Sequence, residues 1–174
     1  MSALDALRPQ PGDKLLFLAE TVQAEAALLH ITDGRLFSEP MDAERAASLR
    51  SDIELGERVD AFVARFGRLQ DTLGDKLLPA VLTWLAEPVG PAIDNLGRAE
   101  RLGWIESADR WMECRQLRNF MIHEYVRDLN VLANSLTQGH AAVPVLTAAA
   151  HTLAGLVTGT AVPAGRQAGR QAGN

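Results

Sequence analysis

The chain has 174 residues, 47% of them hydrophobic, and a formal net charge of −5 at neutral pH. This length and apolar content exclude a disordered chain and fit one domain with a core of ordinary size. The acidic balance makes the chain a poor non-specific binder of RNA or DNA, so any nucleic-acid site has to be a local one.

The cysteine usage and the first residues indicate the compartment. Cys114 is the single cysteine, which makes an intramolecular disulfide impossible and fits a buried thiol in a reducing cytosol. The segment "MSALDALRPQPGDK" lacks the basic and then apolar regions of a signal peptide. We therefore expect a cytoplasmic protein.

Helical periodicity begins after "PQPG". It predicts a helix from about Asp13 to Thr32, with Asp13 as the N-cap and Gly34 as the residue that ends it. The apolar positions repeat at steps of three and four residues: Leu15, Leu18, Val22, Ala26 and Leu29.

A second, long helix is predicted over 41–87. Its apolar stripe runs through Leu55, Val59, Phe62, Phe66, Leu69, Leu73, Leu77, Val81 and Leu85. Gly74 and Pro79 interrupt this pattern, and proline removes one hydrogen bond of the helix ladder. We expect a kink or a break near 74–79.

The next stretch predicts a loop at 87–91 and a short helix from Ala92 to Leu102. Ser107 is a plausible N-cap for a further helix over about 106–126. Trp84, Trp104 and Trp111 are expected in the core or in an interface, since no basic residues interleave with all three.

The segment from Leu129 to Gly165 has no Asp, Glu, Lys or Arg. This uncharged segment is long enough to cross a bilayer. It is rich in Ala and Thr and sparse in Leu, Ile, Phe and Val, so a helix buried in a bundle is the better interpretation, and no membrane is expected as a partner. The final helix occupies parts of 129–158, as one helix or two, with irregularities at Gly139 and Pro144.

The ending "AGRQAGRQAGN" repeats a four-residue unit and predicts a disordered, low-complexity tail over 161–174. Residues 1–160 are predicted to form one all-α domain, an up-and-down bundle of four to five helices.

One polar motif stands out on the helix predicted over 106–126. Arg118, His123 and Tyr125 follow the spacing R-x4-H-x-Y, and Tyr125 is the only tyrosine in the chain. On a straight helix Arg118 and His123 point about 140° apart, whereas Asn119 and His123 share a face. The helix must therefore end or bend near His123, or Arg118 must reach around it, or a two-fold partner must bring a second copy of the motif.

This pair suits phosphodiester chemistry without a metal. An imidazole titrates near neutrality, so His123 can take a proton from a ribose 2′-OH or give one to a leaving oxygen. The guanidinium of Arg118 can hold phosphate oxygens, and Asn119 can orient either group. The plain alternative is that both are ordinary polar residues of a helix face.

Other constellations give no such signal. The histidines at 30, 123, 140 and 151 lack metal-ligand spacing, and no glycine-rich phosphate loop is present, so no metal and no cofactor is expected. Arg68 and Asp71 are three residues apart and are interpreted as a solvated intrahelical pair; the alternative is that they face the cleft and support Arg118.

The stretch "RNFMIHEY" at 118–125 resembles the R-x4-H-x-Y signature of HEPN-domain proteins, specifically the HepT-like ribonuclease toxins. The segments "DNLGRAERLGWIESADRWMECRQLRN" and "RFGRLQDTLGDKLLPAVL" resemble the helices around that motif. The resemblance covers about residues 55–135.

The resemblance implies a helical bundle that forms a homodimer with the motif at a cleft between the subunits. Arg118 and His123 match the catalytic pair of a metal-independent endoribonuclease that leaves a 2′,3′-cyclic phosphate. Tyr125 matches the tyrosine to which the cognate MntA-type minimal nucleotidyltransferase, the antitoxin, attaches AMP. Asn119 and Glu124 are accessory candidates, and Glu124 can pair with Arg118 or Arg127.

Two alternatives to this toxin remain open. One is a non-catalytic HEPN-like subunit that docks on a nucleotidyltransferase and presents its substrate. The other is a structural bundle with an accidental motif.

Overall fold

The computed structural model describes residues 9–123 and 128–160, and within these ranges every regular element is a helix. The all-α prediction is confirmed. The elements are α1 (Asp13–Leu36), α2 (Ala43–Ser48), α3 (Ile53–Asp71), the π-helix η2 (Thr72–Leu77), α4 (Leu78–Trp84), α5 (Ala92–Arg101), α6 (Ala108–His123) and α7 (Leu129–Thr158).

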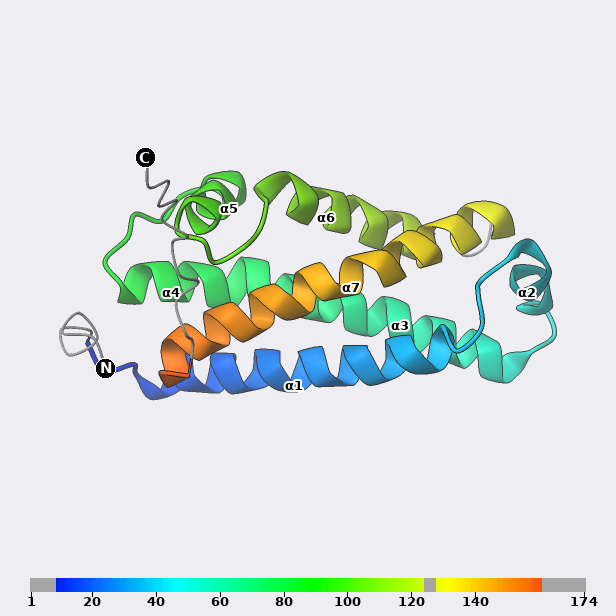
Figure 1. The fold of residues 1–174 in the computed structure, drawn as a ribbon, viewed down its shortest axis with the longest axis horizontal. Coiled ribbons are helices and arrows are strands. Elements are labelled where there is room, and N and C mark those ends of the chain that lie inside the picture. Colours follow the sequence, from blue (N-terminus) through cyan, green and yellow to red (C-terminus); the bar gives the residue numbers. More distant parts are fainter. Residues whose placement is uncertain (1–8, 124–127, 161–174) are drawn as a thin grey trace, which may run out of the picture.

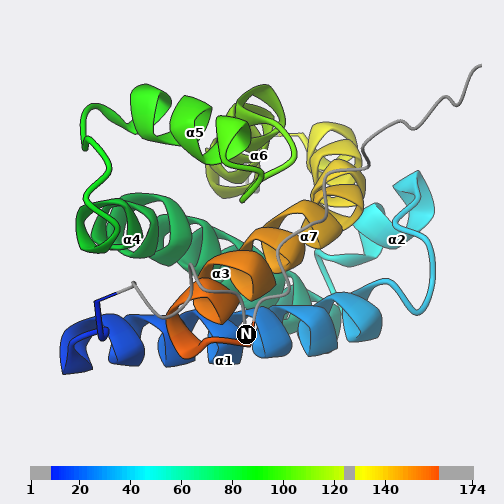
Figure 2. The same ribbon diagram turned by 60° about the vertical axis from the view of Figure 1, so that its left-hand side comes forward.

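Four long rods alternate in direction and form the bundle (Figure 1). They are α1, the continuous run α3–η2–α4, α6 and α7. The α3–η2–α4 rod lies between α1 and α6 in both views, and α7 crosses obliquely over it (Figure 2). The shorter α5 and α2 lie at opposite ends of the bundle. The bundle thus has more helical segments than the four to five predicted, since α2 is an extra short one.

The apolar stripe predicted along the second rod is the centre of the core. Leu55 and every stripe position from Val59 to Val81 are buried, and Leu85 packs against them at the edge. The largest of these side chains, Phe62 and Phe66, have no exposed surface. Burial of this stripe is the main force that holds the rods together.

The first helix differs from its prediction at both ends. Its N-cap is Gly12 and not Asp13, and no side chain caps it. It continues through Gly34 to Leu36, because Asp33 and Leu36 are buried against the bundle. A glycine inside a helix costs only about 1 kcal/mol, which this burial offsets.

The single helix predicted over 41–87 is wrong at its start. Asp42 accepts a hydrogen bond from the Arg45 N–H at 2.8 Å, and Asp52 accepts one from the Leu55 N–H at 2.9 Å. Aspartate is a strong N-cap, so the chain forms a short α2, turns, and begins again as α3.

The predicted irregularity near 74–79 is confirmed, but the rod does not break there. Residues 72–77 widen into a π-helix, in which the Leu78 N–H donates to the carbonyl of Leu73. Pro79 follows directly, in the first turn of α4. The wider turn accommodates a proline ring that would clash with an α-helical carbonyl.

The later elements follow the sequence closely. The predicted helix from Ala92 is α5, and Ser107 caps α6, since its Oγ accepts from the Arg110 N–H at 3.2 Å. The segment 129–158 is one helix that runs through Gly139 and Pro144. The predicted tail at 161–174 lies outside the described residues.

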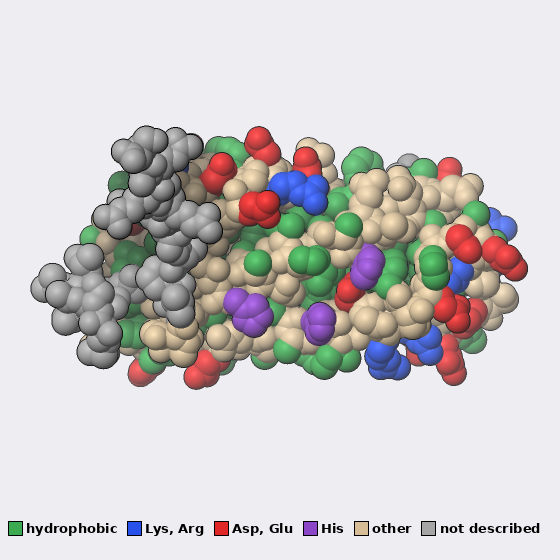
Figure 3. All heavy atoms as spheres, in the orientation of Figure 1, with side chains coloured by type: hydrophobic (Ala, Val, Ile, Leu, Met, Phe, Trp, Pro, Cys, Tyr) green, Lys and Arg blue, Asp and Glu red, His purple; other side chains and the backbone are tan. Residues whose placement is uncertain are grey.

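Two helices are long and apolar enough to cross a membrane by length and composition alone, α1 and α7. Half of the apolar window of α7 is buried inside the bundle, and a third of that of α1. The face over α1 and α7 carries few charges in its centre, where histidines and uncharged side chains lie (Figure 3).

Candidate functional site

Helix α6, which carries the motif, lies close against α3 and η2 because two glycines face it. A Cβ added at Gly67 would be 3.1 Å from Arg118 Nε, and one at Gly74 would be 3.3 Å from Trp111 Nε1. Residues 67 and 74 thus contact 118 and 111, so the two helices run antiparallel in a fixed register. We call this contact the α3–α6 seam.

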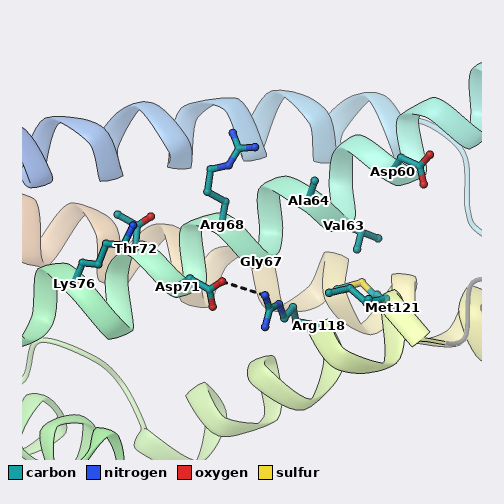
Figure 4. A pocket seen from close by; sticks show the side chains of 11 residues that line it. Asp60, Val63, Ala64, Gly67, Arg68, Asp71, Thr72, Lys76, Arg118 and Met121 are labelled. Carbon is teal, nitrogen blue, oxygen red and sulfur yellow. Dashed lines mark hydrogen bonds and ion pairs between the residues drawn. The ribbon is translucent and has the colours of Figure 1, made fainter.

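Two ion pairs follow the same register. Arg118 Nη2 is 3.1 Å from Asp71 Oδ2, and Arg115 Nη1 is 3.7 Å from Asp75 Oδ1. The predicted intrahelical pair of Arg68 with Asp71 is wrong, because Arg68 points away toward α1 and Asp71 is turned to Arg118 (Figure 4). Of the two readings of Asp71, support of Arg118 is the one that the geometry favours.

A pocket of about 650 Å³ opens along the exposed stripe of α3, beside Arg118. Its floor contains the small residues Ala64 and Gly67, and α6 forms one wall with Arg118, Met121 and Ile122 (Figure 4). The further lining residues are Asp60, Val63, Arg68, Asp71, Thr72 and Lys76. The lining therefore holds three cations and two carboxylates, which makes a polar pocket with a small positive balance.

Arg118 contacts α3 at two points in this pocket, Asp71 and Gly67. Its side chain is 30% exposed, so part of the guanidinium remains open to the solvent. Its Nε is buried and has no hydrogen-bond partner within the described chain. A guanidinium that is bound to one carboxylate oxygen and partly open to the solvent can donate further N–H groups to phosphate oxygens without leaving its place.

The other predicted site residues are placed only in part. Asn119 is exposed and lies on the helix face next to that of Arg118. His123 is the last described residue of α6, and the structure describes its backbone only. By helix geometry it lies about 7.5 Å along the axis from Arg118 and on the Asn119 side. Glu124 and Tyr125 lie outside the described residues.

Two nearby groups have shifted pKa values. Burial raises the pKa of the Glu25 carboxyl, while the neighbouring Thr72 hydroxyl and the charges of Arg68 and Lys76 act in the opposite direction. Burial also raises the pKa of the Cys114 thiol. Cys114 therefore stays protonated at neutral pH and is a poor nucleophile.

A second polar contact lies between α1 and α7. His140 Nδ1 is 2.7 Å from Asp33 Oδ1, and the imidazole stacks on Phe37 with ring centroids 4.2 Å apart. Within residues 9–123 and 128–160, no three His, Cys, Asp or Glu side chains gather as a metal site would need.

Sequence reasoning missed Gly67, and it gave Arg118 only as the alternative to the intrahelical pair of Asp71. A signal for the contact of Asp71 with Arg118 was present in the spacing. Asp71 and Asp75 are one helical turn apart, and so are Arg115 and Arg118, which is the pattern of two ion pairs between antiparallel helices.

Comparison of the chain with protein-family models, with curated proteins and with solved structures finds no match. The case for a function therefore depends on the motif residues and on the geometry of the pocket beside them.

Proposed function

We propose that the protein is a HepT-like HEPN toxin, a metal-independent endoribonuclease in which Arg118 and His123 cut RNA in a cleft shared by two copies of the chain. The single observation that carries the proposal is the position of Arg118. Its guanidinium lies at the wall of an open pocket, on the helix that also carries His123, which is the fifth residue after it.

The proposed reaction is an internal transfer. A ribose 2′-oxygen attacks the adjacent phosphorus, an O2′–P bond forms and the P–O5′ bond breaks, which leaves a 2′,3′-cyclic phosphate and a 5′-hydroxyl. One imidazole takes the proton of the 2′-OH and an imidazolium gives a proton to the leaving O5′. Arg118 stabilises the extra negative charge on the phosphoryl oxygens in the transition state.

The two proton transfers are the reason why the proposed active site needs two copies of the chain. One chain supplies a single histidine of the motif, whereas the reaction needs a base and an acid at the same time. A two-fold axis through the cleft would supply both from identical subunits. The pocket of one chain, with its three cations, would then be half of the RNA-binding cleft.

The test is an RNA-cleavage assay with excess chelator. Wild type should produce 2′,3′-cyclic phosphate ends, and His123→Ala should lower the rate by about 10²- to 10⁴-fold, the usual contribution of a general acid or base. Arg118→Ala should lower it to a similar extent, whereas the matched control Arg115→Ala, one turn away on α6, should retain most of it. Equal cleavage by wild type and His123→Ala would refute the nuclease.

Tyr125 is the proposed point of control. Incubation with the partner nucleotidyltransferase, ATP and Mg²⁺ should add whole multiples of an AMP mass, and Tyr125→Phe should remove that addition. The added phosphates would bring negative charge to the place where an RNA backbone enters. An unchanged mass shift in Tyr125→Phe would show that another residue is modified.

The second candidate function is a non-catalytic subunit that docks on a nucleotidyltransferase. The observation that favours it is the acidic part of the pocket, where Asp60 and Asp71 lie beside the cations and Asp71 already pairs with Arg118. In that case the protein binds the nucleotidyltransferase, and neither wild type nor His123→Ala arrests growth or cuts RNA.

A further inference from the structure

We infer that Asp71 and Gly67 are positioning residues that hold the Arg118 guanidinium in its working orientation. This inference deepens the proposed function and rests on it. Neither residue belongs to the R-x4-H-x-Y motif, and both come from α3, which is far from the motif in the sequence.

We call Asp71 and Gly67 together the Arg118 seat. Its first part is the carboxylate of Asp71. Asp71 Oδ2 accepts one hydrogen bond from Arg118 Nη2 at 3.1 Å, and this contact joins α3 to α6 across the mouth of the pocket (Figure 4). This single contact ties the end of the Arg118 side chain to α3 and leaves its other N–H groups unoccupied by Asp71. Asp71 therefore orients Arg118 without blocking all of it.

The second part is the missing side chain at residue 67. The Arg118 stem crosses α3 at this glycine, and an added Cβ would lie 3.1 Å from Nε and 3.3 Å from Cγ. Contacts this short force the neighbour to move by a few tenths of an ångström. The glycine thus sets how deeply the arginine stem lies, while Asp71 sets where its end points.

A second ion pair in the same seam provides the matched control. Arg115 and Asp75 join the same two rods, at 3.7 Å, and both side chains are 40% exposed or more. Neither is part of the motif or of the pocket lining. The variant Asp75→Ala therefore removes an ion pair of the same kind and leaves the contacts of Arg118 unchanged.

The experiment compares Asp71→Ala, Asp71→Asn and Asp75→Ala in steady-state RNA cleavage. We expect Asp71→Ala to lower kcat by roughly 10- to 100-fold, the effect of a small misplacement of a group in the active site. KM should stay the same or fall, because a negative charge beside the RNA is lost. Asp71→Asn keeps an acceptor oxygen and should restore part of kcat, while Asp75→Ala should resemble wild type.

The glycine is tested separately. Gly67→Ala should lower kcat. Alanine favours a helix over glycine by about 1 kcal/mol, so a lower kcat cannot be explained by a loss of helix propensity. Gly34→Ala is the control, since a Cβ there meets nothing within 4 Å. A Gly67→Ala enzyme with the kcat of wild type would overturn the role of the glycine.

A readout that needs no RNA separates this inference from the proposed function. The Nε–H of Arg118 is buried, so its NMR signal should exchange slowly with water in wild type and in Asp75→Ala, and faster in Asp71→Ala. If wild type cuts no RNA, the nuclease proposal fails while the exchange rate still tests the seat. If Asp71→Ala changes neither the exchange rate nor kcat, the seat is refuted.

Discussion

Helix α7 lies against α1 mostly through apolar side chains, with one polar contact between His140 and Asp33, whereas α6 lies against α3 and η2 through glycines, ion pairs and an arginine stem. Along the first contact, which we call the α1–α7 seam, both helices carry buried apolar side chains, among them Ala142, Leu146 and Ala150 of α7 and Val22 and Leu29 of α1. Along the α3–α6 seam the close contacts involve Arg118 and Trp111, and the ion pairs are half exposed.

The two seams therefore differ in how much they contribute to the stability of the fold. Apolar burial contributes about 25 cal/mol per Å², so the α1–α7 seam stabilises the fold, while half-exposed ion pairs contribute at most about 1 kcal/mol each. Polar groups in the α3–α6 seam are kept within reach of a ligand at the cost of stability. The candidate site thus lies at the contact that has the partly exposed ion pairs, and functional regions are often drawn from the less stable parts of a protein.

The largest effect is expected in the shared core. Phe62 is fully buried, and its ring lies edge-on to Phe37 with centroids 5.5 Å apart. Phe62→Ala should lower the free energy of unfolding by about 3–5 kcal/mol, measured by urea denaturation. A loss below about 1 kcal/mol would mean that this centre is not closely packed, and the contrast between the seams would lose its basis.

The next effect tests the close approach of α7. A Cβ at Gly139 would lie 3.1 Å from Met121 Sδ and 3.3 Å from Phe62 Cε1, and both of these side chains are fully buried. Gly139→Ala should therefore destabilise the protein by roughly 1–3 kcal/mol, the usual cost of overpacking. Gly34→Ala, in open space on α1, should instead be neutral or slightly stabilising; equal changes in both variants would contradict the reading.

A smaller effect, of opposite sign, is expected for a buried polar side chain of α3. Gln70 is 3% exposed, and neither polar atom of its side chain has a hydrogen-bond partner within the described residues. A buried amide without partners costs about 1–3 kcal/mol. Gln70→Met keeps the length and removes this cost, so the urea midpoint should rise by an amount that corresponds to about 1 kcal/mol; a fall would show that the amide is hydrogen-bonded.

The sequence predicts the apolar core of the bundle better than the polar contacts of the α3–α6 seam, for a physical reason. A stripe such as Val59, Phe62 and Phe66 is periodic, and periodicity needs only the chain itself. Its burial on α3 is confirmed. The errors at Asp13 and at 41–52 concern helix ends: Gly12 is the N-cap of α1, and Asp42 and Asp52 cap two separate helices.

The candidate site is predictable only in part. Arg118 is found because its spacing to His123 is local to one helix. For Asp71 the sequence favours Arg68, its neighbour on the same helix, because a pattern along one chain favours short-range partners. The observed partner is the alternative, Arg118, which is 47 residues away. Gly67 carries no chemistry of its own, so its role follows only from what lies opposite.

The smallest effect concerns Glu25, which joins α1 to η2 between the two seams. Burial raises the pKa of its carboxyl above the ordinary value, so the folded chain holds this proton at pH values where the unfolded chain has released it. Folding is therefore favoured by this group at low pH, and the contribution is lost as the pH rises from about 4 through the raised pKa. Glu25→Gln cannot ionise and should melt about 1–3 °C above wild type at neutral pH. Near pH 4 the two should melt together, and a variant less stable than wild type at neutral pH would mean that Arg68 and Lys76 stabilise the carboxylate by more than its burial costs.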